Sequence, residues 1–175
     1  TGGRDVIVTD VGQHQMWVAQ YYRFKSPRNQ ITSGGLGTMG FGFPAAIGAK
    51  LGRPNERVLA ICGDGSFQMN MQEFSTAVAN DLDLKIILIK NGHHGMVRQW
   101  QTLFFEGNHS CCKFELNPDY VKLAQSYGAK AFRIDSPVDL EASFKEGLST
   151  KGVVLMEVVV DPTEMVYPML TPGGK

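Results

Sequence analysis

Short runs of consecutive apolar residues alternate along the chain with segments of helical pattern. The runs are rich in Val, Ile and Leu and are bounded by Gly, Pro, Asn or Asp, which is typical of β-strands. They predict strands at residues 5–9, 30–33, 57–62, 85–90, 129–134 and 153–160. The intervening segments predict helices at residues 13–22, 44–51, 71–80, 95–105, 118–127 and 138–149. Asn117-Pro118 and Ser136-Pro137 each resemble an N-cap followed by proline at the first helical position.

Several of these strands are apolar at successive rather than alternate positions, which indicates burial on both faces, as in a parallel sheet covered by helices. The chain therefore predicts an α/β fold: a doubly wound, mostly parallel sheet of about six strands with right-handed crossovers. At about 150 residues per domain, the 175 residues form one domain. Three prolines and Gly173-Gly174 predict a surface tail over residues 162–175.

The charges narrow the function classes. Seventeen Lys and Arg balance seventeen Asp and Glu, so the basic excess that nucleic acid or an anionic membrane attracts is missing. The apolar runs at residues 86–89 and 153–156 are far shorter than the roughly 18 residues of a membrane span.

The polar start does not resemble a signal peptide, and the missing initiator Met suggests a piece of a longer chain. Three cysteines, two of them adjacent, favour reduced thiols and a cytosol-like compartment.

Glycine is concentrated where a parallel sheet binds ligands. Twelve of the 20 glycines lie in the first 65 residues, mostly at predicted strand ends, and open parallel sheets bind ligands at the carboxyl ends of their strands. The segment Gly35–Gly40 fits G-x-G-x-x-G, but the only acid at the spacing of a ribose ligand, Glu56, precedes the next strand instead of ending it. We interpret this segment as a loop whose backbone approaches a ligand other than a nicotinamide dinucleotide.

Two turns at successive strand ends carry the strongest chemical signal. Asp64, within Gly63-Asp64-Gly65-Ser66, follows the strand at 57–62, and Asn91 follows the strand at 85–90. If these strands are neighbours, a carboxylate and an amide oxygen emerge side by side, a donor set that suits Mg²⁺ shared with substrate phosphates. The backbone N–H groups of Gly63 and Gly65 and the Ser66 hydroxyl would complete a diphosphate cradle. Asp-Gly and Asn-Gly are also common in ordinary turns, but their joint occurrence favours the metal.

Four sequence blocks resemble one enzyme family. Gly-Asp-Gly followed at this distance by Asn is similar to the thiamine diphosphate motif. The blocks at residues 12–17, 32–42, 63–70 and 95–101 resemble the acetohydroxyacid synthase (acetolactate synthase) catalytic subunit, in order and over nearly the whole chain. The block Gly95-Met96-Val97-Arg98-Gln99-Trp100 favours this family over other thiamine enzymes. Many family members have Asn-Asn where this chain has Lys90-Asn91, a departure that leaves the second Asn in place.

The resemblance implies a role for each matching residue. Mg²⁺ would be held by the side chains of Asp64 and Asn91 and by the main-chain carbonyl of His93. The diphosphate would contact Gly12, Gln13, His14, Gly63, Gly65, Ser66 and Gly95. Gly37 and Met39 would lie by the aminopyrimidine, Met96 would pack on the cofactor, and Val97 and Trp100 would line the substrate channel. The alternatives without a functional role are a solvent-facing His14 and core positions for Trp100 and the methionines.

The implied parent enzyme would decarboxylate pyruvate and join the product to a second 2-oxo acid, pyruvate or 2-oxobutyrate, in branched-chain amino-acid biosynthesis. Its activating glutamate belongs to a separate domain of a neighbouring subunit, so no catalytic residue is expected in this chain, which alone would be inactive. FAD would bind mainly outside this chain. Expected partners are the remaining domains, a second subunit in a homodimer or tetramer, and a small regulatory subunit. The expected location of the parent is the cytoplasm, an organelle matrix or a plastid. Another thiamine diphosphate-dependent 2-oxo acid decarboxylase or oxidase, or a non-catalytic Mg–diphosphate binding module, are the alternatives.

Overall fold

A six-stranded parallel sheet organises the chain. The computed structural model describes residues 1–169, and its strands follow the order β2-β1-β3-β4-β6-β5. Every neighbouring pair is parallel, so the predicted doubly wound sheet is confirmed and the sheet is wholly parallel. The six strands are β1 Val6–Thr9, β2 Gln30–Thr32, β3 Val58–Gly63, β4 Leu84–Lys90, β5 Lys130–Ile134 and β6 Val154–Val159.

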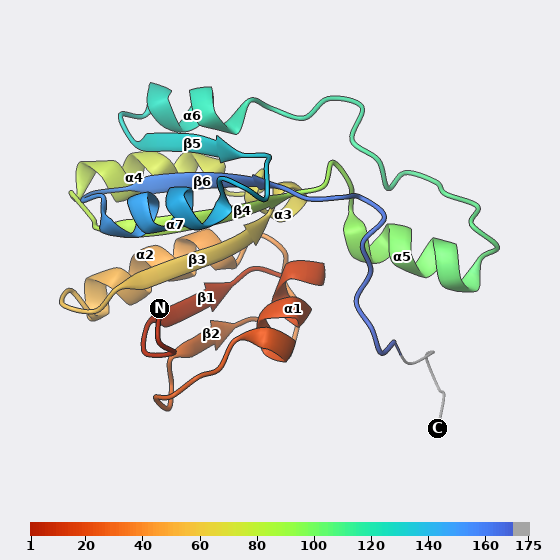
Figure 1. Cartoon of the computed structure of the whole chain (residues 1–175), viewed down its shortest axis with the longest axis horizontal. Helices are drawn as coiled ribbons and strands as arrows, with labels where there is room; N and C mark the ends of the chain where they lie inside the picture. Colours follow the sequence, from red (N-terminus) through yellow and green to blue (C-terminus); the bar gives the residue numbers. More distant parts are fainter. Residues whose placement is uncertain (170–175) are drawn as a thin grey trace.

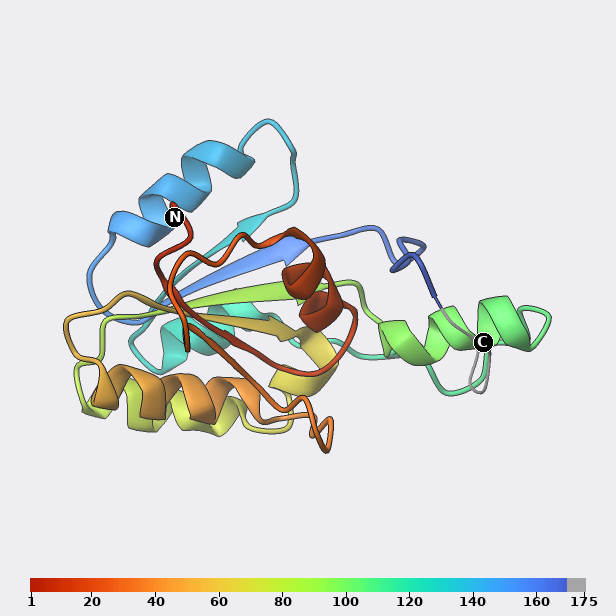
Figure 2. The same cartoon turned by 90° about the horizontal axis from the view of Figure 1, so that it is seen from below.

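Helices cover the sheet from both sides. Residues of α2, α4 and α6 pack into the core on one face, and residues of α1 and α7 pack on the other, as Figures 1 and 2 show. The bounds are α1 Gln13–Tyr21, α2 Gly42–Gly52, α3 Asp64–Phe67, α4 Phe74–Ala79, α5 Gly95–Phe104, α6 Tyr120–Ser126 and α7 Leu140–Ser149. A short 3₁₀ turn, η1 Met71–Glu73, precedes α4.

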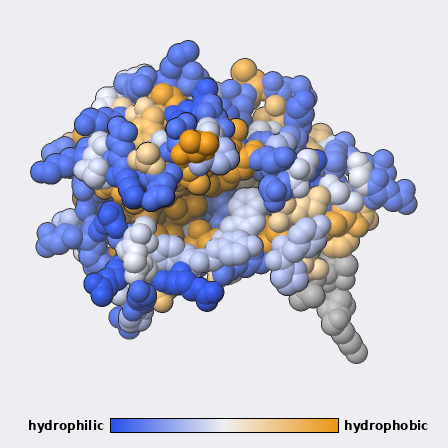
Figure 3. Space-filling view, viewed as in Figure 1, coloured by the Kyte–Doolittle hydropathy of each residue, from blue (hydrophilic) through white to orange (hydrophobic). Residues whose placement is uncertain are grey.

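The continuous apolar runs are explained by this two-sided cover. Along β3, Val58, Ala60 and Cys62 enter the core under α2 and α4, while Leu59 and Ile61 face the opposite core. Successive strand side chains point to opposite faces, so a strand covered on both sides is apolar at every position. The second face is covered less completely. An apolar hollow between α1 and α7, lined by Val18, Leu59 and Phe144 among others, lies on the face seen in Figure 3.

Both helix starts predicted from an N-cap followed by proline are wrong. The helix predicted from residue 118 begins at Tyr120, where the Asp119 side chain caps it by accepting from the Lys122 backbone N–H at 3.2 Å. The helix predicted from residue 138 begins at Leu140. In both cases the proline lies in the approach to the helix and not at its first position. Residues 64–67, expected as a simple turn, form the single helical turn α3.

Helix α5 and the C-terminal segment lie beside the sheet. In Figures 1 and 2, α5 extends away from the layered body, and Gln99 is its only buried residue. The tail predicted over 162–175 is mostly exposed where it is described, but Val166 is fully buried, and residues 170–175 lie outside the described residues. None of the described helices has the length and hydrophobicity to cross a membrane. Cys62, Cys111 and Cys112 are all unbridged thiols.

Candidate functional site

The turns after β3 and β4 lie next to each other. The two strands pair in parallel with Gly63 opposite Ile89, so the predicted neighbourhood of the two strands is confirmed. Asp64 begins α3 directly after β3, and Asn91 directly follows β4. The backbone N–H of Gly92 donates to Asp64 Oδ2 at 2.7 Å and ties the second turn to the first. Topology thus brings the predicted carboxylate and amide to one place.

Asp64 is a buried carboxylate without a cationic partner. Its side chain belongs to a residue that is 1% exposed, and none of the ion pairs among residues 1–169 includes it. Oδ1 accepts from Gly65 N at 3.0 Å, and Oδ2 accepts from Gly92 N and from Asn117 Nδ2 at 2.9 Å. Burial raises the pKa of Asp64, and the bonds from Asn117, Gly92 and Gly65 oppose that rise. A cation at this carboxylate would relieve the cost of its burial.

Asn91 and Gln13 hold each other. Asn91 Nδ2 donates to Gln13 Oε1 at 3.3 Å, and Asn91 Oδ1 accepts from the His93 backbone N–H at 2.9 Å. Gln13 Nε2 donates to Gln99 Oε1 at 2.9 Å and to the Glu164 carbonyl at 3.0 Å. The Gln13 amide is therefore fully engaged inside the protein, where it fixes the turn that carries Asn91.

His14 is buried with an unused ring nitrogen. It begins α1 beside Gln13, and its Nε2 has no hydrogen-bond partner among residues 1–169. Burial lowers the pKa of His14 to about 4, so the ring is neutral near pH 7. A Cβ at Gly12 or at Gly63 would lie 2.9 Å from His14 Cε1. These two glycines therefore leave the space that the imidazole occupies, and the predicted alternative of a solvent-facing His14 is wrong.

Asp10 anchors the glycine-rich loop that precedes α2. It follows β1, is fully buried, and accepts from the backbone N–H groups of Gly40 at 2.9 Å and Gly42 at 2.8 Å. Gly37 and Gly40 have φ of 61° and 85°, a region that favours glycine. The loop brings Met39 to the lining of the cleft, which does not include Gly37. The backbone of this loop is thus held by a carboxylate from the neighbouring strand.

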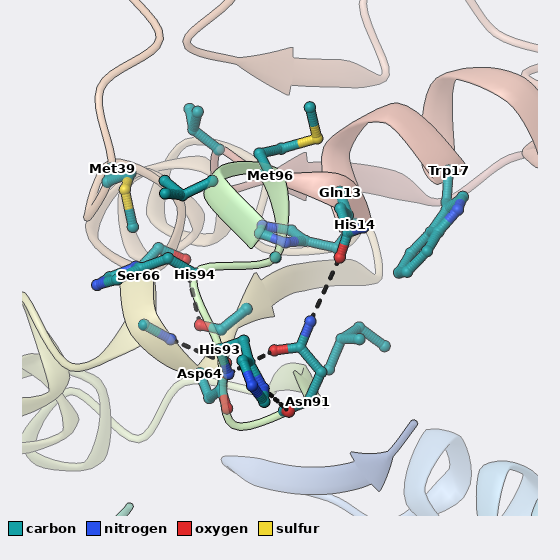
Figure 4. A pocket seen from close by; sticks show the side chains of 17 residues that line it. Gln13, His14, Trp17, Met39, Asp64, Ser66, Asn91, His93, His94 and Met96 are labelled. Carbon is teal, nitrogen blue, oxygen red and sulfur yellow. Dashed lines mark hydrogen bonds between the residues drawn. The ribbon is translucent and has the colours of Figure 1, made fainter. Parts of the chain in front are cut away.

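One cleft collects nearly all of the predicted site residues (Figure 4). Its lining includes Gly12, Gln13, His14, Met39, Gly63, Asp64, Gly65, Ser66, Asn91, His93, Gly95, Met96 and Val97, and among the predicted residues only Gly37 and Trp100 are missing from it. Val11, Trp17, Ile89 and His94 also line it, although the sequence did not single them out. The cleft lies at the carboxyl ends of the strands, where parallel sheets bind ligands.

Trp100 lies beside this cleft and not in it. It shares a shallow apolar hollow with Met96, Val97 and Phe105, and the first two also line the cleft. Its ring meets Phe104 edge to face, with centroids 5.8 Å apart. Trp100 is 38% exposed, so the alternative of a core tryptophan is wrong.

Two predicted donors of the diphosphate cradle are already used. The Gly65 N–H is expected to face the ligand, but it donates to Asp64 Oδ1. The Ser66 hydroxyl donates to the Gly63 carbonyl at 3.1 Å. Packing explains the glycine at position 65, since a Cβ there would lie 2.7 Å from the Phe114 ring. At Gly95 a Cβ would fall 2.0 Å from Gln13 Oε1. These glycines admit neighbouring side chains.

The residues present fit a magnesium diphosphate. Asp64, Asn91 and the His93 carbonyl are hard oxygen donors, which Mg²⁺ prefers, and His14 Nε2 leaves one buried polar atom available to a ligand. Among residues 1–169, no three His, Cys, Asp or Glu side chains converge as a metal cluster. A metal held here would therefore meet one carboxylate, an amide oxygen and a main-chain oxygen.

Comparisons with known proteins point to one enzyme family. Residues 10–158 match the family described as "Thiamine pyrophosphate enzyme, C-terminal TPP binding domain". The mitochondrial acetolactate synthase catalytic subunit of Saccharomyces cerevisiae is 48% identical over 99% of this chain, and the acetolactate synthase isozyme 2 large subunit of Escherichia coli is 48% identical over 97%. The chain spans only 25% and 31% of those two proteins.

A solved structure shares the fold. The thiamine diphosphate-dependent 4-hydroxybenzoylformate decarboxylase of Rhodococcus jostii RHA1 superposes with a TM-score of 0.81 over 90% of this chain and 29% of its own. The sequence identity is 24%, so this likeness concerns the architecture alone.

Proposed function

The chain belongs to the thiamine pyrophosphate enzymes as their C-terminal TPP-binding domain, and on that premise we propose that it serves an acetolactate synthase catalytic subunit. The proposed parent condenses pyruvate, after decarboxylation, with pyruvate or 2-oxobutyrate. Support comes from the identity of about 48% to acetolactate synthase subunits along almost the whole chain. The two relatives already described are three to four times longer than the chain, so the reaction would depend on parts of the parent beyond this domain.

The observation that carries the proposal is the pairing of the two turns. Asp64, buried and outside every ion pair of residues 1–169, lies one hydrogen bond from the turn that presents Asn91. Asp64, Asn91 and the His93 carbonyl would hold Mg²⁺, and the metal would carry the diphosphate into the cleft. Gly12, Gln13, His14, Gly63, Gly65, Ser66 and Gly95 would surround that diphosphate. His14 is neutral and its Nε2 has no partner among the described residues, so this nitrogen could form a hydrogen bond with the diphosphate.

The apolar part of the cleft would hold the organic part of the cofactor. Thiamine diphosphate supplies a carbon nucleophile that adds to the 2-oxo group and then accepts the electron pair released with CO₂. Met39 from the glycine-rich loop and Met96 from α5 line the cleft and would supply apolar contacts to this part of the cofactor. Gly37 would support the loop, and Val97 and Trp100 would form the wall past which the second 2-oxo acid approaches.

The rest of the parent completes the site in this proposal. No described residue is assigned as the acid or base at the reacting carbon, because the activating glutamate is expected from another domain of a neighbouring subunit. FAD, a homodimeric or tetrameric assembly, a small regulatory subunit and a cytoplasmic or organellar location are proposed for the parent on the same grounds. Isolated from that domain, this chain would form no acetolactate.

Product analysis of the full-length protein tests the proposal. Pyruvate alone should give acetolactate, and pyruvate with 2-oxobutyrate should also give acetohydroxybutyrate, in a reaction that requires Mg²⁺ and thiamine diphosphate. Asp64→Ala should abolish both products. Asp5→Ala is the matched control, because Asp5 is a buried carboxylate at the opposite end of the sheet, paired with Arg57 at 2.9 Å. Acetaldehyde or acetyl phosphate as the product would indicate another thiamine enzyme, and no product would indicate a binding module.

A further inference from the structure

The Asp64 side chain accepts a hydrogen bond from a segment far along the chain. Asn117, in the loop before α6, donates from Nδ2 to Asp64 Oδ2 at 2.9 Å, across 53 positions of sequence. Tyr120, the first residue of α6, donates from its hydroxyl to Asn117 Oδ1 at 2.7 Å, which is a shorter contact than the 3.2 Å from the same hydroxyl to the Asp64 carbonyl. A carboxylate only accepts and this hydroxyl donates, so a single orientation of the Asn117 amide satisfies both bonds. The sequence suggested Asn117 as a helix cap, but its side chain serves Asp64 instead.

The support behind Asn117 is rigid. Tyr120 is fully buried, and its ring meets Phe67 edge to face at 6.0 Å between centroids. The Lys90 ammonium lies 5.5 Å from the centroid of the same ring. Glu157, fully buried on β6, fixes that ammonium at 3.0 Å. Packing and an ion pair therefore hold the tyrosine hydroxyl in the position from which it orients Asn117.

The two oxygens of Asp64 are used unequally. Oδ2 receives two donors, Gly92 N and Asn117 Nδ2, whereas Oδ1 receives only Gly65 N. Each carboxylate oxygen accepts about two hydrogen bonds, so Oδ2 is saturated and Oδ1 retains one lone pair. Removing Asn117 would leave Oδ2 half-used and would let the carboxylate rotate about its terminal torsion.

We propose that Asn117, held by Tyr120, is a positioning residue that occupies Asp64 Oδ2 and thereby leaves Oδ1 as the oxygen that Asp64 offers to the metal. The inference rests on the proposed function, because it takes Asp64 as the metal ligand. Groups that orient a metal ligand affect affinity strongly, typically by about 10–100-fold when removed. Asn117 and Tyr120 act through Asp64 and do not themselves touch the metal.

Electron paramagnetic resonance of Mn²⁺ tests this inference in the full-length protein with saturating thiamine diphosphate. Asn117→Ala should raise the Mn²⁺ dissociation constant by about 10–100-fold. It should also change the line shape of bound Mn²⁺, since Oδ2 becomes available to the metal. Tyr120→Phe keeps the ring packing and should weaken Mn²⁺ binding less. Asn29→Ala is the matched control: Asn29 is also a buried amide, bonded to Arg4 O at 2.7 Å and to Arg53 at 3.0 Å, at the other end of the sheet.

The outcomes separate the two claims. Weaker Mn²⁺ binding in Asn117→Ala and Tyr120→Phe, with Asn29→Ala unchanged, supports the positioning role. If both variants bind Mn²⁺ as wild type does while Asp64→Asn does not bind it, the positioning role is overturned and the metal assignment stands. If Asp64→Asn itself binds Mn²⁺ normally, the metal site of the proposed function is wrong, and the inference goes with it. Should Asn117→Ala fail to fold, Tyr120→Phe alone decides, with wild-type affinity overturning the role.

Discussion

Two buried lysines at the amino ends of the strands are fully paired, whereas two buried groups at the carboxyl ends, Asp64 and His14, lack a partner of one kind among residues 1–169. At the amino ends, the ammonium of Lys85, whose residue is 1% exposed, contacts Asp83 and donates to the carbonyls of Thr150 and Gly152. Lys50 likewise donates to the carbonyls of Pro54 and Glu56 at 2.9 and 2.8 Å. At the carboxyl ends, Asp64 is buried without a cation and His14 Nε2 has no partner among the described residues.

This difference separates what stabilises the domain from what it is built to bind. Buried polar groups are normally paired, and a buried group left unpaired lowers stability unless a ligand completes it. Proteins tolerate such groups mainly at functional sites. The lysines at the amino ends, where among the described residues only Arg57 Nε stays unpaired, therefore stabilise the fold, whereas Asp64 and His14 at the carboxyl ends keep an acceptor and a ring nitrogen available to a ligand. Substitutions at the two ends should have opposite effects on stability and on cofactor binding.

The largest effect is expected for Asp64→Ala. Asp64 supplies the only negative charge among the proposed metal ligands, so affinity for thiamine diphosphate with Mg²⁺ should fall by about 1000-fold or more, about 4 kcal/mol. Stability without cofactor should change little, because the gain from removing a buried charge is offset by leaving the Gly65, Gly92 and Asn117 donors without their acceptor. Calorimetric titration with and without Mg²⁺ measures the first effect and denaturant unfolding the second. Asp5→Ala should show the reverse, and equal affinity in Asp64→Ala and wild type would remove Asp64 from the metal site.

The fold was largely predictable, and the reason is local. Each strand run is continuous in sequence, and burial on both faces makes it apolar at every position, so the order of elements could be predicted from the pattern alone. The turns with Asp64 and Asn91 could be found because they follow directly from strand ends. The resemblance supplied the roles of Gly12, His14 and Met39, which no local pattern would have given.

Contacts between distant segments were not predictable in the same way. The Asp10 carboxylate binds Gly40 and Gly42, 30 and 32 positions away, and nothing near Asp10 signals this. Asn117 before Pro118 had the pattern of a helix cap, but the fold offered it a buried carboxylate, and Asp119 took the cap. Side chains that can cap a helix can also bond elsewhere, and only the tertiary structure decides between these uses.

The acid side of the stability profile should depend on His14. Its pKa is about 4 in the folded chain and about 6.5 when unfolded, so between these values the unfolded chain binds a proton that the folded chain does not. Stability without cofactor is therefore intact above pH 6.5 and falls as the pH drops toward 4, by about 3 kcal/mol from this group. His14→Phe should lack this share of the loss. Denaturant unfolding at pH 7 and pH 4 measures the free energy of unfolding that each protein loses. An identical loss in wild type and His14→Phe would mean that the His14 ring contacts water in the folded chain.

Lys85→Met should destabilise the domain without touching the cleft. It leaves the carbonyls of Thr150 and Gly152 without their buried donor, which costs about 2–3 kcal/mol of unfolding free energy. Cofactor affinity, measured on the protein that remains folded, should be that of wild type. A fall in affinity as large as the fall in stability would mean that the two ends are coupled.

The smallest change in stability is expected for Trp100→Leu. Trp100 is 38% exposed beside the cleft, so the free energy of unfolding should change by less than about 1 kcal/mol. In the full-length protein the ratio of 2-oxobutyrate to pyruvate as acceptor should shift by about 10-fold, because an apolar wall is reshaped. Product ratios and melting temperature are measured together. An unchanged ratio would exclude Trp100 from the path of the second 2-oxo acid.

The position of the metal decides whether Asp64 and Asn91 form a magnesium site. Crystals of the full-length protein grown with Mn²⁺ and thiamine diphosphate, measured at the manganese absorption edge, would locate the ion by its anomalous signal. One peak is expected at the carboxyl ends of β3 and β4, within about 2.0–2.3 Å of oxygens of Asp64, Asn91 and the His93 carbonyl. A peak bound elsewhere, with Asp64 and Asn91 contacting only protein, would contradict this assignment.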